Sequence, residues 1–349
     1  MDARSSQPPP LRHEDHARTA YLDGWRGVSI LLVLIGHFTG LPAIRWGQLG
    51  VELFFALSGR LMAQILFVDG FPLRPFFARR FSRVWPGLLI LVLVLMALSS
   101  YGWPPGEAPI DAGTGLSALT FTIGYLRGVL VPGSASLDHI WSLAIEEHAY
   151  VILALIALLV RRCGMRAAPI VLVIALLSIA AGVVRSAMLG QDYYAAYWVT
   201  DSRLASIFLP ALLFLERDRL IAWLGRVAPM APLLAGASGM LLHYHMVPDA
   251  LRYSAGPLLF GIAIVTLPCA GGWLTALLEL RVLRWFGLMS FSLYLWQQPF
   301  MVASQNAPPS MRLLCLALAV LTGLASYHMI EQPFRRWLNA RFARVNGKD

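Results

Sequence analysis

Long apolar blocks alternate with short polar segments over almost the whole chain. A membrane-spanning helix needs about 20 predominantly apolar residues. Eleven blocks approach this length: Gly27–Leu41, Gly50–Phe67, Val84–Tyr101, Gly115–Val131, Leu137–Val160, Ala168–Leu189, Asp201–Leu215, Met230–His245, Ser254–Trp273, Trp285–Val302 and Met311–Ile330. Only helices and closed barrels satisfy backbone hydrogen bonds inside a bilayer, and the periodicity of these blocks favours helices. The pattern therefore predicts an all-α fold, a polytopic membrane helix bundle.

The positions of the basic residues predict which blocks cross the membrane. Arginine clusters occur before the first block, after the second and at intervals down to the carboxyl terminus. Such clusters are typical of cytoplasmic loops, and all of them face the cytoplasm only if Gly115–Val131 does not cross. This block contains Arg127, Thr120 and Thr122 and is the most polar candidate. We predict ten transmembrane helices with both termini cytoplasmic, and Gly115–Val131 as a re-entrant or interfacial segment.

Composition narrows the class further. Apolar residues make up 58% of the 349 residues and charged residues 13%, whereas soluble domains have about 45–50% and about 25%. This excludes a soluble enzyme, a disordered protein and a disulfide scaffold. The net charge of +9 is explained by the arginines of cytoplasmic loops, so no nucleic-acid partner is predicted. The three cysteines are far apart and form no Cys/His cluster, so neither a metal site nor a disulfide framework is indicated.

The chain is expected to form one membrane domain between two short tails. Residues 1–20 contain three consecutive prolines and charges of both signs, and are expected to be a disordered cytoplasmic tail. Residues 21–337 are expected to form the membrane domain, and residues 338–349 a basic cytoplasmic tail. No signal peptide is expected, because the first apolar run starts late and leads into a full helix.

The first predicted helix carries two ionisable residues, which are costly at membrane depth and are therefore functional candidates. Arg26 lies at its cytoplasmic start and His37 follows eleven residues later. Eleven residues are about three turns and about 16 Å of rise, so both side chains are expected on nearly the same face, with the imidazole about halfway across the bilayer. The alternative is a snorkelling arginine and a core histidine paired with a neighbouring hydroxyl.

Other polar residues are expected at similar depth. Glu146 and Glu147 lie about 12–15 Å below the outer surface by helical rise, and their side chains point about 100° apart. Arg60 and Tyr294 reach this depth on the second and tenth helices. We expect one polar cavity, lined by Arg26, His37 and at least one of Glu146, Glu147 and Tyr294. A purely structural pair between Arg60 and a glutamate is the alternative.

The segment that follows the second block concentrates arginines and aromatic residues. Arg79, Arg80 and Arg83 lie among phenylalanines and precede Trp85. Three guanidinium groups with flanking rings suit a phosphorylated, partly apolar ligand, such as a nucleotide-bearing thioester. The alternative is the usual positive charge of a cytoplasmic loop, in contact with lipid headgroups.

Seven motifs, in order along the chain, resemble those of the acyltransferase-3 family of integral membrane O-acyltransferases. They are Tyr21-Leu22-Asp23-Gly24-Trp25-Arg26-Gly27 leading to His37, Gly50-Val51-Glu52-Leu53-Phe54-Phe55-Ala56-Leu57-Ser58-Gly59, Arg79-Arg80-Phe81-Ser82-Arg83-Val84-Trp85-Pro86, Ile140-Trp141-Ser142-Leu143-Ala144-Ile145-Glu146-Glu147-His148-Ala149-Tyr150, Asp201-Ser202-Arg203, Ser290-Phe291-Ser292-Leu293-Tyr294-Leu295-Trp296 and Ile330-Glu331-Gln332-Pro333-Phe334-Arg335-Arg336. Each motif is weak alone, and the ordered set is specific.

The resemblance implies a ten-helix bundle in the bacterial cytoplasmic (inner) membrane. The implied reaction moves an acyl group, with acetyl expected, from cytoplasmic acyl-CoA to a hydroxyl, commonly on a sugar of a surface or secreted glycan. By match, His37 corresponds to the essential histidine of the family and Arg26 to its paired arginine. The cytoplasmic basic motif is matched by Arg79, Arg80 and Arg83, and the paired acids by Glu146 and Glu147.

The sequence departs from the family pattern at four positions. Glu52 stands where aspartate is usual, and His148 where glutamine is common. Arg60 replaces an apolar residue, and Gln297 follows Trp296 where a histidine is frequent. The last two changes fall near the expected cavity, so they bear on the identity of the acceptor and leave the reaction intact.

The mechanism that these residues suggest is hydroxyl deprotonation by His37, the side chain whose ordinary pKa suits base catalysis near neutrality. His37 either deprotonates the acceptor directly or carries the acyl group on its imidazole, and the sequence leaves both routes open. Coenzyme A phosphates would bind the cytoplasmic arginines. Glu146 or Glu147 would orient an imidazole or bind acceptor hydroxyls, with Tyr294, Ser58 and Arg60 assigned to substrate binding.

A rival interpretation is a proton-coupled transporter, because ten helices with buried arginine, histidine and glutamate also describe such a carrier. The sequence contains no clear inverted repeat, and a carrier gives the basic aromatic loop no function. A non-catalytic membrane scaffold leaves the buried charges unexplained. The partners expected are a hydroxyl-bearing, carbohydrate-type acceptor and membrane lipids. The sequence does not distinguish among acceptors, acyl chain lengths or oligomeric states.

Overall fold

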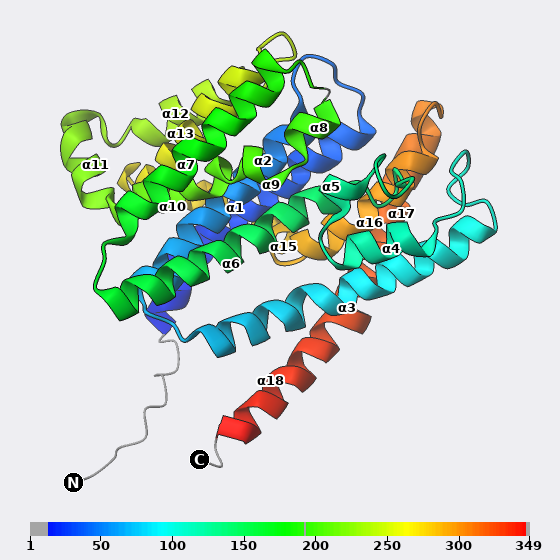
Figure 1. Cartoon of the computed structure of the whole chain (residues 1–349), viewed down its shortest axis with the longest axis horizontal. Coiled ribbons are helices and arrows are strands. Elements are labelled where there is room, and N and C mark those ends of the chain that lie inside the picture. The colour runs from blue at the N-terminus through cyan, green and yellow to red at the C-terminus, as the bar shows by residue number, and fades with distance from the viewer. Residues whose placement is uncertain (1–12, 192, 347–349) are drawn as a thin grey trace.

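A computed structural model describes residues 13–191 and 193–346, and within these ranges the chain is all helical (Figure 1). The long helices are α1 (His13–Phe38), α2 (Trp46–Ala63), α3 (Leu73–Ser100), α6 (Ile140–Cys163), α7 (Ala167–Val183), α10 (Ala205–Leu215), α12 (Ala231–Leu242), α13 (Asp249–Thr266), α16 (Ser290–Ala303), α17 (Pro309–Ser326) and α18 (Gln332–Asn346). Shorter helices connect them: α4 (Ala112–Leu119), α5 (Ile123–Leu126), α8 (Tyr193–Tyr197), α9 (Thr200–Arg203), α11 (Arg217–Leu224), α14 (Trp273–Leu278) and α15 (Arg281–Leu288). The predicted helical class is confirmed.

Six helical segments are long and apolar enough to cross a membrane: Trp46–Val68, Leu73–Ser100, Ile140–Cys163, Ala167–Met188, Asp249–Cys269 and Pro309–Leu338. A seventh is added if Arg217–Val227 and Ala231–Leu241, which are bent by 96°, count as one span. The chain is therefore a multi-pass membrane protein. The count of ten and the cytoplasmic orientation of the termini stay predictions.

The polar block Gly115–Val131 does not form a spanning helix, as the sequence predicted. Its residues lie in α4, of eight residues, in α5, of four, and in the loops around them, and these helices rise only about 12 and 6 Å. The segment packs closely on the chain before α9, because a Cβ at Gly124 would lie 2.3 Å from the carbonyl oxygen of Trp198. This contact makes α4 and α5 a cap over one end of the bundle.

Figure 1 shows α18 descending to the same side of the molecule as the start of α1. We call this side the inner end, and the side where α1 ends and α2 begins the outer end, following the predicted topology. Helix α1 begins at His13 and α18 ends at Asn346, so helix extends into both predicted tails. The remaining tail positions, 1–12 and 347–349, lie outside the described residues, and the domain boundaries stay a prediction.

Candidate active site

His37 lies in the last turn of α1, and its Nδ1 is 2.5 Å from Oε1 of Gln297 on α16. Gln297 is fully buried, and its Nε2 donates to the carbonyl of Tyr294 and to Oε1 of Gln298, which orients the amide. Because an amide oxygen can only accept, Nδ1 carries the hydrogen and Nε2 keeps its lone pair. His37 is therefore held in the tautomer that a general base requires.

A hollow of about 270 Å³ opens beside His37 at the outer end of the bundle. Its lining is Gly36, His37, Gly40, Met301, Ser304, Gln305, Asn306 and Arg312. A Cβ at Gly36 would lie 2.3 Å from the backbone nitrogen of Gly47, and a Cβ at Gly47 would lie 3.2 Å from Nε2 of His37. The two glycines thus let α1 and α2 approach each other without covering the imidazole.

The structure places His37 near the end of α1, and its predicted depth of about halfway across the bilayer stays a prediction. Helix α1 ends at Phe38, so His37 is one residue from the outer end of its helix. The apolar block extended to Leu41, but the chain turns earlier because Gly40 adopts a φ of 67°, which glycine reaches without strain. His37 therefore lies closer to the end of its helix than the apolar block indicated.

Arg26 shares α1 with His37 but not the same hollow. Its Nη1 forms an ion pair with Oδ1 of Asp23, 3.0 Å away and one turn earlier. Neither of the two hollows described here includes Arg26, Glu146 or Glu147. Neither hollow is therefore the single polar cavity that the sequence predicted. Arg26 and His37 do not line the same hollow, because about 16 Å of helical rise separates them.

The paired acids lie in a cluster with Arg80, which we call the inner ionic cluster. Oε1 of Glu147 is 2.5 Å from Nη2 of Arg80, and Oε2 of Glu146 is 3.7 Å from the same nitrogen. The other oxygen of Glu146 accepts hydrogen bonds from the hydroxyls of Ser58 and Tyr150. The structure thus gives Arg80 an internal partner, whereas the sequence predicted it as a ligand of donor phosphates.

The other two arginines of this motif lie in different surroundings. Arg79 is exposed, and its guanidinium is 4.7 Å from the centroid of the Phe71 ring. Arg83 is half-buried, and the positive charges that act on it are those of Arg26, Arg80 and Arg335, opposed by Glu146. Within the described ranges, Arg83 has no carboxylate within 4 Å. Glu331 also acts on Arg83, so what distinguishes Arg83 is that it lacks a bonded carboxylate among the described residues and can take a phosphate ligand.

The residues assigned to substrate binding occupy separate places. The Tyr294 hydroxyl is 2.5 Å from Oγ of Ser142 and donates to the carbonyl of His139, near the His37–Gln297 pair. Ser58 belongs to the inner ionic cluster. Arg60 donates to the hydroxyl of Tyr21 at 3.1 Å, and in the part of the chain that the structure describes it pairs with no glutamate. The predicted Arg60–glutamate pair is therefore wrong, because Arg60 points to the start of α1.

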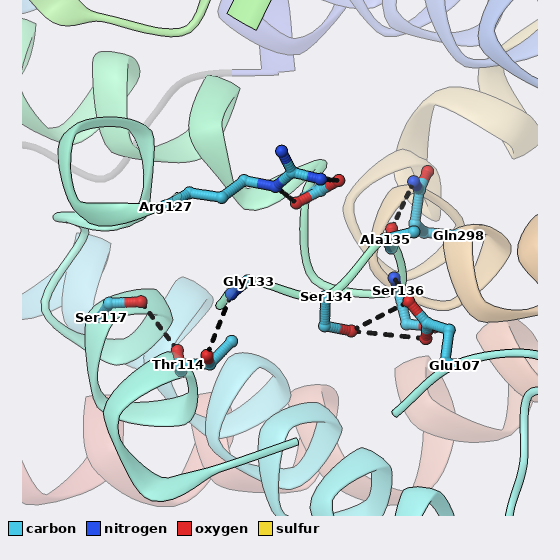
Figure 2. Close-up of polar contacts among 10 residues, drawn as sticks. Glu107, Thr114, Ser117, Arg127, Gly133, Ser134, Ala135, Ser136 and Gln298 are labelled. Carbon is cyan, nitrogen blue, oxygen red and sulfur yellow. Dashed lines mark hydrogen bonds and ion pairs between the residues drawn. The ribbon is translucent and has the colours of Figure 1, made fainter. Parts of the chain in front are cut away.

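Sequence reasoning missed a second group of polar residues at the outer end. Arg127 forms two hydrogen bonds with Asp138, Nε to Oδ1 at 2.5 Å and Nη2 to Oδ2 at 2.9 Å. Glu107 accepts hydrogen bonds from Ser134 and Ser136, and Figure 2 shows these contacts. Arg127 and Glu107 line a hollow of about 510 Å³, the outer hollow. Two features of the sequence could have indicated these residues. Arg127 is charged and lies in a segment predicted not to cross the membrane, and Asp138 is charged and lies just before a family motif.

The residues described provide no group of three or more His, Cys, Asp or Glu side chains that could hold a metal ion. The geometry places His37, in a fixed tautomer, at the outer end of the bundle and a group of arginines at the opposite end. The two are joined through the helices α1, α3, α6 and α16.

Comparisons with known proteins show which family the sequence matches. A family model described as an acyltransferase domain matches residues 19–335. The putative peptidoglycan O-acetyltransferase YrhL of Bacillus subtilis is 28% identical over 92% of this chain and 56% of its own length. The peptidoglycan O-acetyltransferase OatA of Listeria monocytogenes is 25% identical over 90% of this chain and 55% of its own length, and the O-acetyltransferase OatA of Staphylococcus aureus is 26% identical over 90% and 57%. The chain spans about half the length of these relatives. No solved structure matches it.

Proposed function

Because this chain belongs to the acyltransferase-3 family of membrane acyltransferases, we propose that it transfers an acyl group, most simply acetyl, from cytoplasmic acyl-CoA to a hydroxyl of a carbohydrate acceptor on the outer side. The single observation that carries the proposal is the fixed tautomer of His37, a residue that lines a hollow at the outer end. The named O-acetyltransferase relatives support the acetyl group and a glycan acceptor, including peptidoglycan.

In the proposed reaction, Nε2 of His37 takes the proton of the acceptor hydroxyl. The hydroxyl oxygen attacks the thioester carbonyl, the new C–O bond forms and the C–S bond breaks. The leaving thiolate takes the proton back from the imidazolium, which balances the charges. The alternative route, with the acyl group carried briefly on the imidazole, uses the same nitrogen and has the same net balance.

The acyl donor is proposed to enter at the inner end. Arg83 and exposed Arg79 are the ligands we assign to the coenzyme A phosphates, with Arg26 and Arg335 adding positive charge nearby. Arg80 takes a different role: its pairing with Glu147 anchors α3 to α6 and so positions Arg79 and Arg83. This differs from the equal roles that the sequence motif alone suggested.

The topology we propose has ten spans, both termini cytoplasmic, in a bacterial cytoplasmic membrane. It counts the six segments long enough to cross and the bent pair α11 and α12 as seven spans, and adds α1, the consecutive pair α9 and α10, and the consecutive pair α15 and α16. The pair α15 and α16 extends from residue 281 to residue 303, which rises about 34 Å, enough for a bilayer core of about 30 Å. An even number of spans is consistent with α1 starting and α18 ending on one side.

The test uses purified protein in detergent with radiolabelled acetyl-CoA and no acceptor. We expect slow thioester hydrolysis in which water replaces the acceptor, and we expect His37→Ala to abolish it while acetyl-CoA binding survives. Transfer to a soluble glycan should be lost in the same variant. Reconstituted protein that moves a solute across vesicles but neither hydrolyses acetyl-CoA nor transfers the acetyl group would favour the transporter interpretation instead.

A further inference from the structure

The outer hollow lies next to the His37 hollow and shares part of its wall with it. Its lining comes from three parts of the chain that are distant in the sequence: 105–108, Arg127 with 133–135, and 302–303 with 305–306. Gln305 and Asn306 line both hollows. A ligand in the outer hollow would therefore contact two exposed residues that also line the hollow of His37.

The loop that carries this hollow is held at several points. Figure 2 shows Glu107 receiving hydrogen bonds from Ser134 and Ser136, and Gln298 donating to the carbonyl of Ala135 at 2.8 Å. Gln298 is the neighbour of Gln297, so one turn of α16 fastens both this loop and the imidazole of His37. A site held in place before the ligand arrives avoids the entropic cost of ordering it during binding.

Arg127 is fixed in the same way, through two of its three nitrogens. Its pair with Asp138 uses Nε and Nη2, so Nη1 takes no part in it. The guanidinium also lies 4.9 Å from the ring centroid of Tyr194 and 5.2 Å from that of Trp198. Figure 2 shows Arg127 and Glu107 with the loop residues Gly133 to Ser136 between them.

The chemistry of this lining fits a polyhydroxylated ligand. A carboxylate accepts hydrogen bonds, a guanidinium donates them, and the amides of Gln305 and Asn306 do both, which matches hydroxyl groups that donate and accept. Glu107 and Arg127 carry opposite charges, so the lining selects neither a strong anion nor a strong cation. The volume of about 510 Å³ is within the range of about 300–1,000 Å³ that is usual for small-ligand sites.

We propose that the outer hollow binds the sugar unit that carries the acceptor hydroxyl, and that Arg127, Gln305 and Asn306 contact this sugar directly. Glu107 and Asp138 act as positioning residues, through the loop and through Arg127. The shared edge at Gln305 and Asn306 lets a hydroxyl of the bound sugar reach toward Nε2 of His37. This inference rests on the proposed function, in which His37 deprotonates that hydroxyl.

The experiment measures two activities of the purified full chain on the same samples. One is acetyl-CoA hydrolysis without acceptor, which needs His37 but no sugar. The other is acetyl transfer to a panel of soluble glycans: a peptidoglycan tetrasaccharide, a lipopolysaccharide core oligosaccharide and an exopolysaccharide fragment. We expect Arg127→Gln to keep hydrolysis within twofold of the unmodified protein. The apparent KM for the accepted glycan should rise about ten- to a hundredfold, the usual range for a lost hydrogen bond to a charged group.

A matched control is available at the same end of the bundle. Arg185 also pairs with an aspartate, Asp201, through Nε and Nη2 at 3.1 and 2.6 Å, but it lines neither hollow. Arg185→Gln should leave the acceptor KM unchanged. If Arg127→Gln fails to fold, Asn306→Gly replaces it, because glycine keeps the left-handed backbone at φ 62° and removes only the amide.

The outcomes separate the two hypotheses. Unmodified protein that neither hydrolyses acetyl-CoA nor transfers the acetyl group would overturn the proposed function itself. Protein that hydrolyses the donor but transfers to none of the glycans would overturn the carbohydrate assignment. Transfer with the same acceptor KM in Arg127→Gln and Asn306→Gly as in Arg185→Gln would overturn the outer hollow as the sugar site.

Discussion

At the scale of single residues, the tautomer of His37 is selected by a side chain on another helix. Gln297 stands where the family frequently has a histidine, and the difference has a chemical consequence. A glutamine amide does not titrate, and its oxygen cannot donate a hydrogen, so Nδ1 of His37 stays protonated at every pH in the working range. A histidine partner has two tautomers and permits either nitrogen of His37 to carry the hydrogen.

We therefore expect Gln297→Leu to lower turnover about tenfold, because one hydrogen bond is worth about 1–1.5 kcal/mol and about 1.4 kcal/mol corresponds to a factor of ten in rate. Acetyl-CoA affinity, measured by calorimetry or thermal shift, should not change. Gln297→Glu keeps an oxygen acceptor opposite Nδ1 and should retain most of the turnover. Equal activity in the leucine variant and the unmodified protein would remove Gln297 from the mechanism.

A second residue-scale expectation concerns Asp138, which lies before the first residue of α6 and outside the spanning segments. Burial raises the pKa of the Asp138 carboxyl to about 6, although Arg127 opposes the shift. The folded state then binds a proton more tightly than the unfolded state, whose aspartate pKa is about 3.9. The contribution of this group to the free energy of unfolding is largest below about pH 4, falls as the pH rises to about 6, and is constant above that.

The measurement is thermal unfolding of the detergent-solubilised protein from pH 4 to pH 8. Asp138→Asn does not titrate, so the difference in unfolding temperature between this variant and the unmodified protein should change between pH 4 and 6 and stay constant above. Glu107 is the other acid that acts on Asp138, and Glu107→Gln serves as the control for its titration. A difference that is constant over the whole range would contradict the raised pKa.

At the scale of elements, α3 places three neighbouring arginines in three environments. Arg79 is exposed, Arg80 is paired with Glu147, and Arg83 faces other arginines. The spacing of the motif contributes to this. Positions 79 and 80 are about 100° apart around the helix, so their side chains point in different directions, and position 83 lies one turn later on the face of positions 79 and 80. The motif in the sequence contains the three residues but not their partners, which come from α6 and α18.

The difference predicts separable effects. Arg80→Ala should lower stability strongly, by about 3–5 kcal/mol, because it leaves the carboxylates of Glu147 and Glu146 without their partner. Arg83→Ala should keep the unfolding temperature and raise the apparent KM for acetyl-CoA about ten- to a hundredfold.

Adding Glu147→Gln to Arg80→Ala removes the unpaired charge and should restore part of the lost stability. Unfolding temperature and donor affinity are measured on the same purified variants. An Arg80→Ala protein of normal stability with weakened donor binding would instead return Arg80 to the phosphate site that its motif suggests.

At the scale of the whole molecule, the sequence predicted what depends on neighbouring residues. Apolar blocks predicted the helices, and polar residues correctly marked Gly115–Val131 as a segment that does not cross. It could not predict contacts between distant positions. His37 and Gln297 are 260 residues apart, and Arg80 and Glu147 are 67 apart. Helical periodicity gives the face on which a side chain lies but not which helix packs against that face.

The topology has its own test, because the chain carries a natural reporter. Cys163 is an exposed free cysteine at the end of α6. The proposed topology places this end of the span on the cytoplasmic side. A membrane-impermeant maleimide should therefore label it in inverted membrane vesicles and not in intact spheroplasts. Asn306→Cys, introduced into a Cys163→Ser background, should label in spheroplasts, because it lies on the shared edge of the two hollows at the outer end. Labelling of Cys163 from outside would reverse the bundle and place the His37 hollow on the same side as the acyl donor.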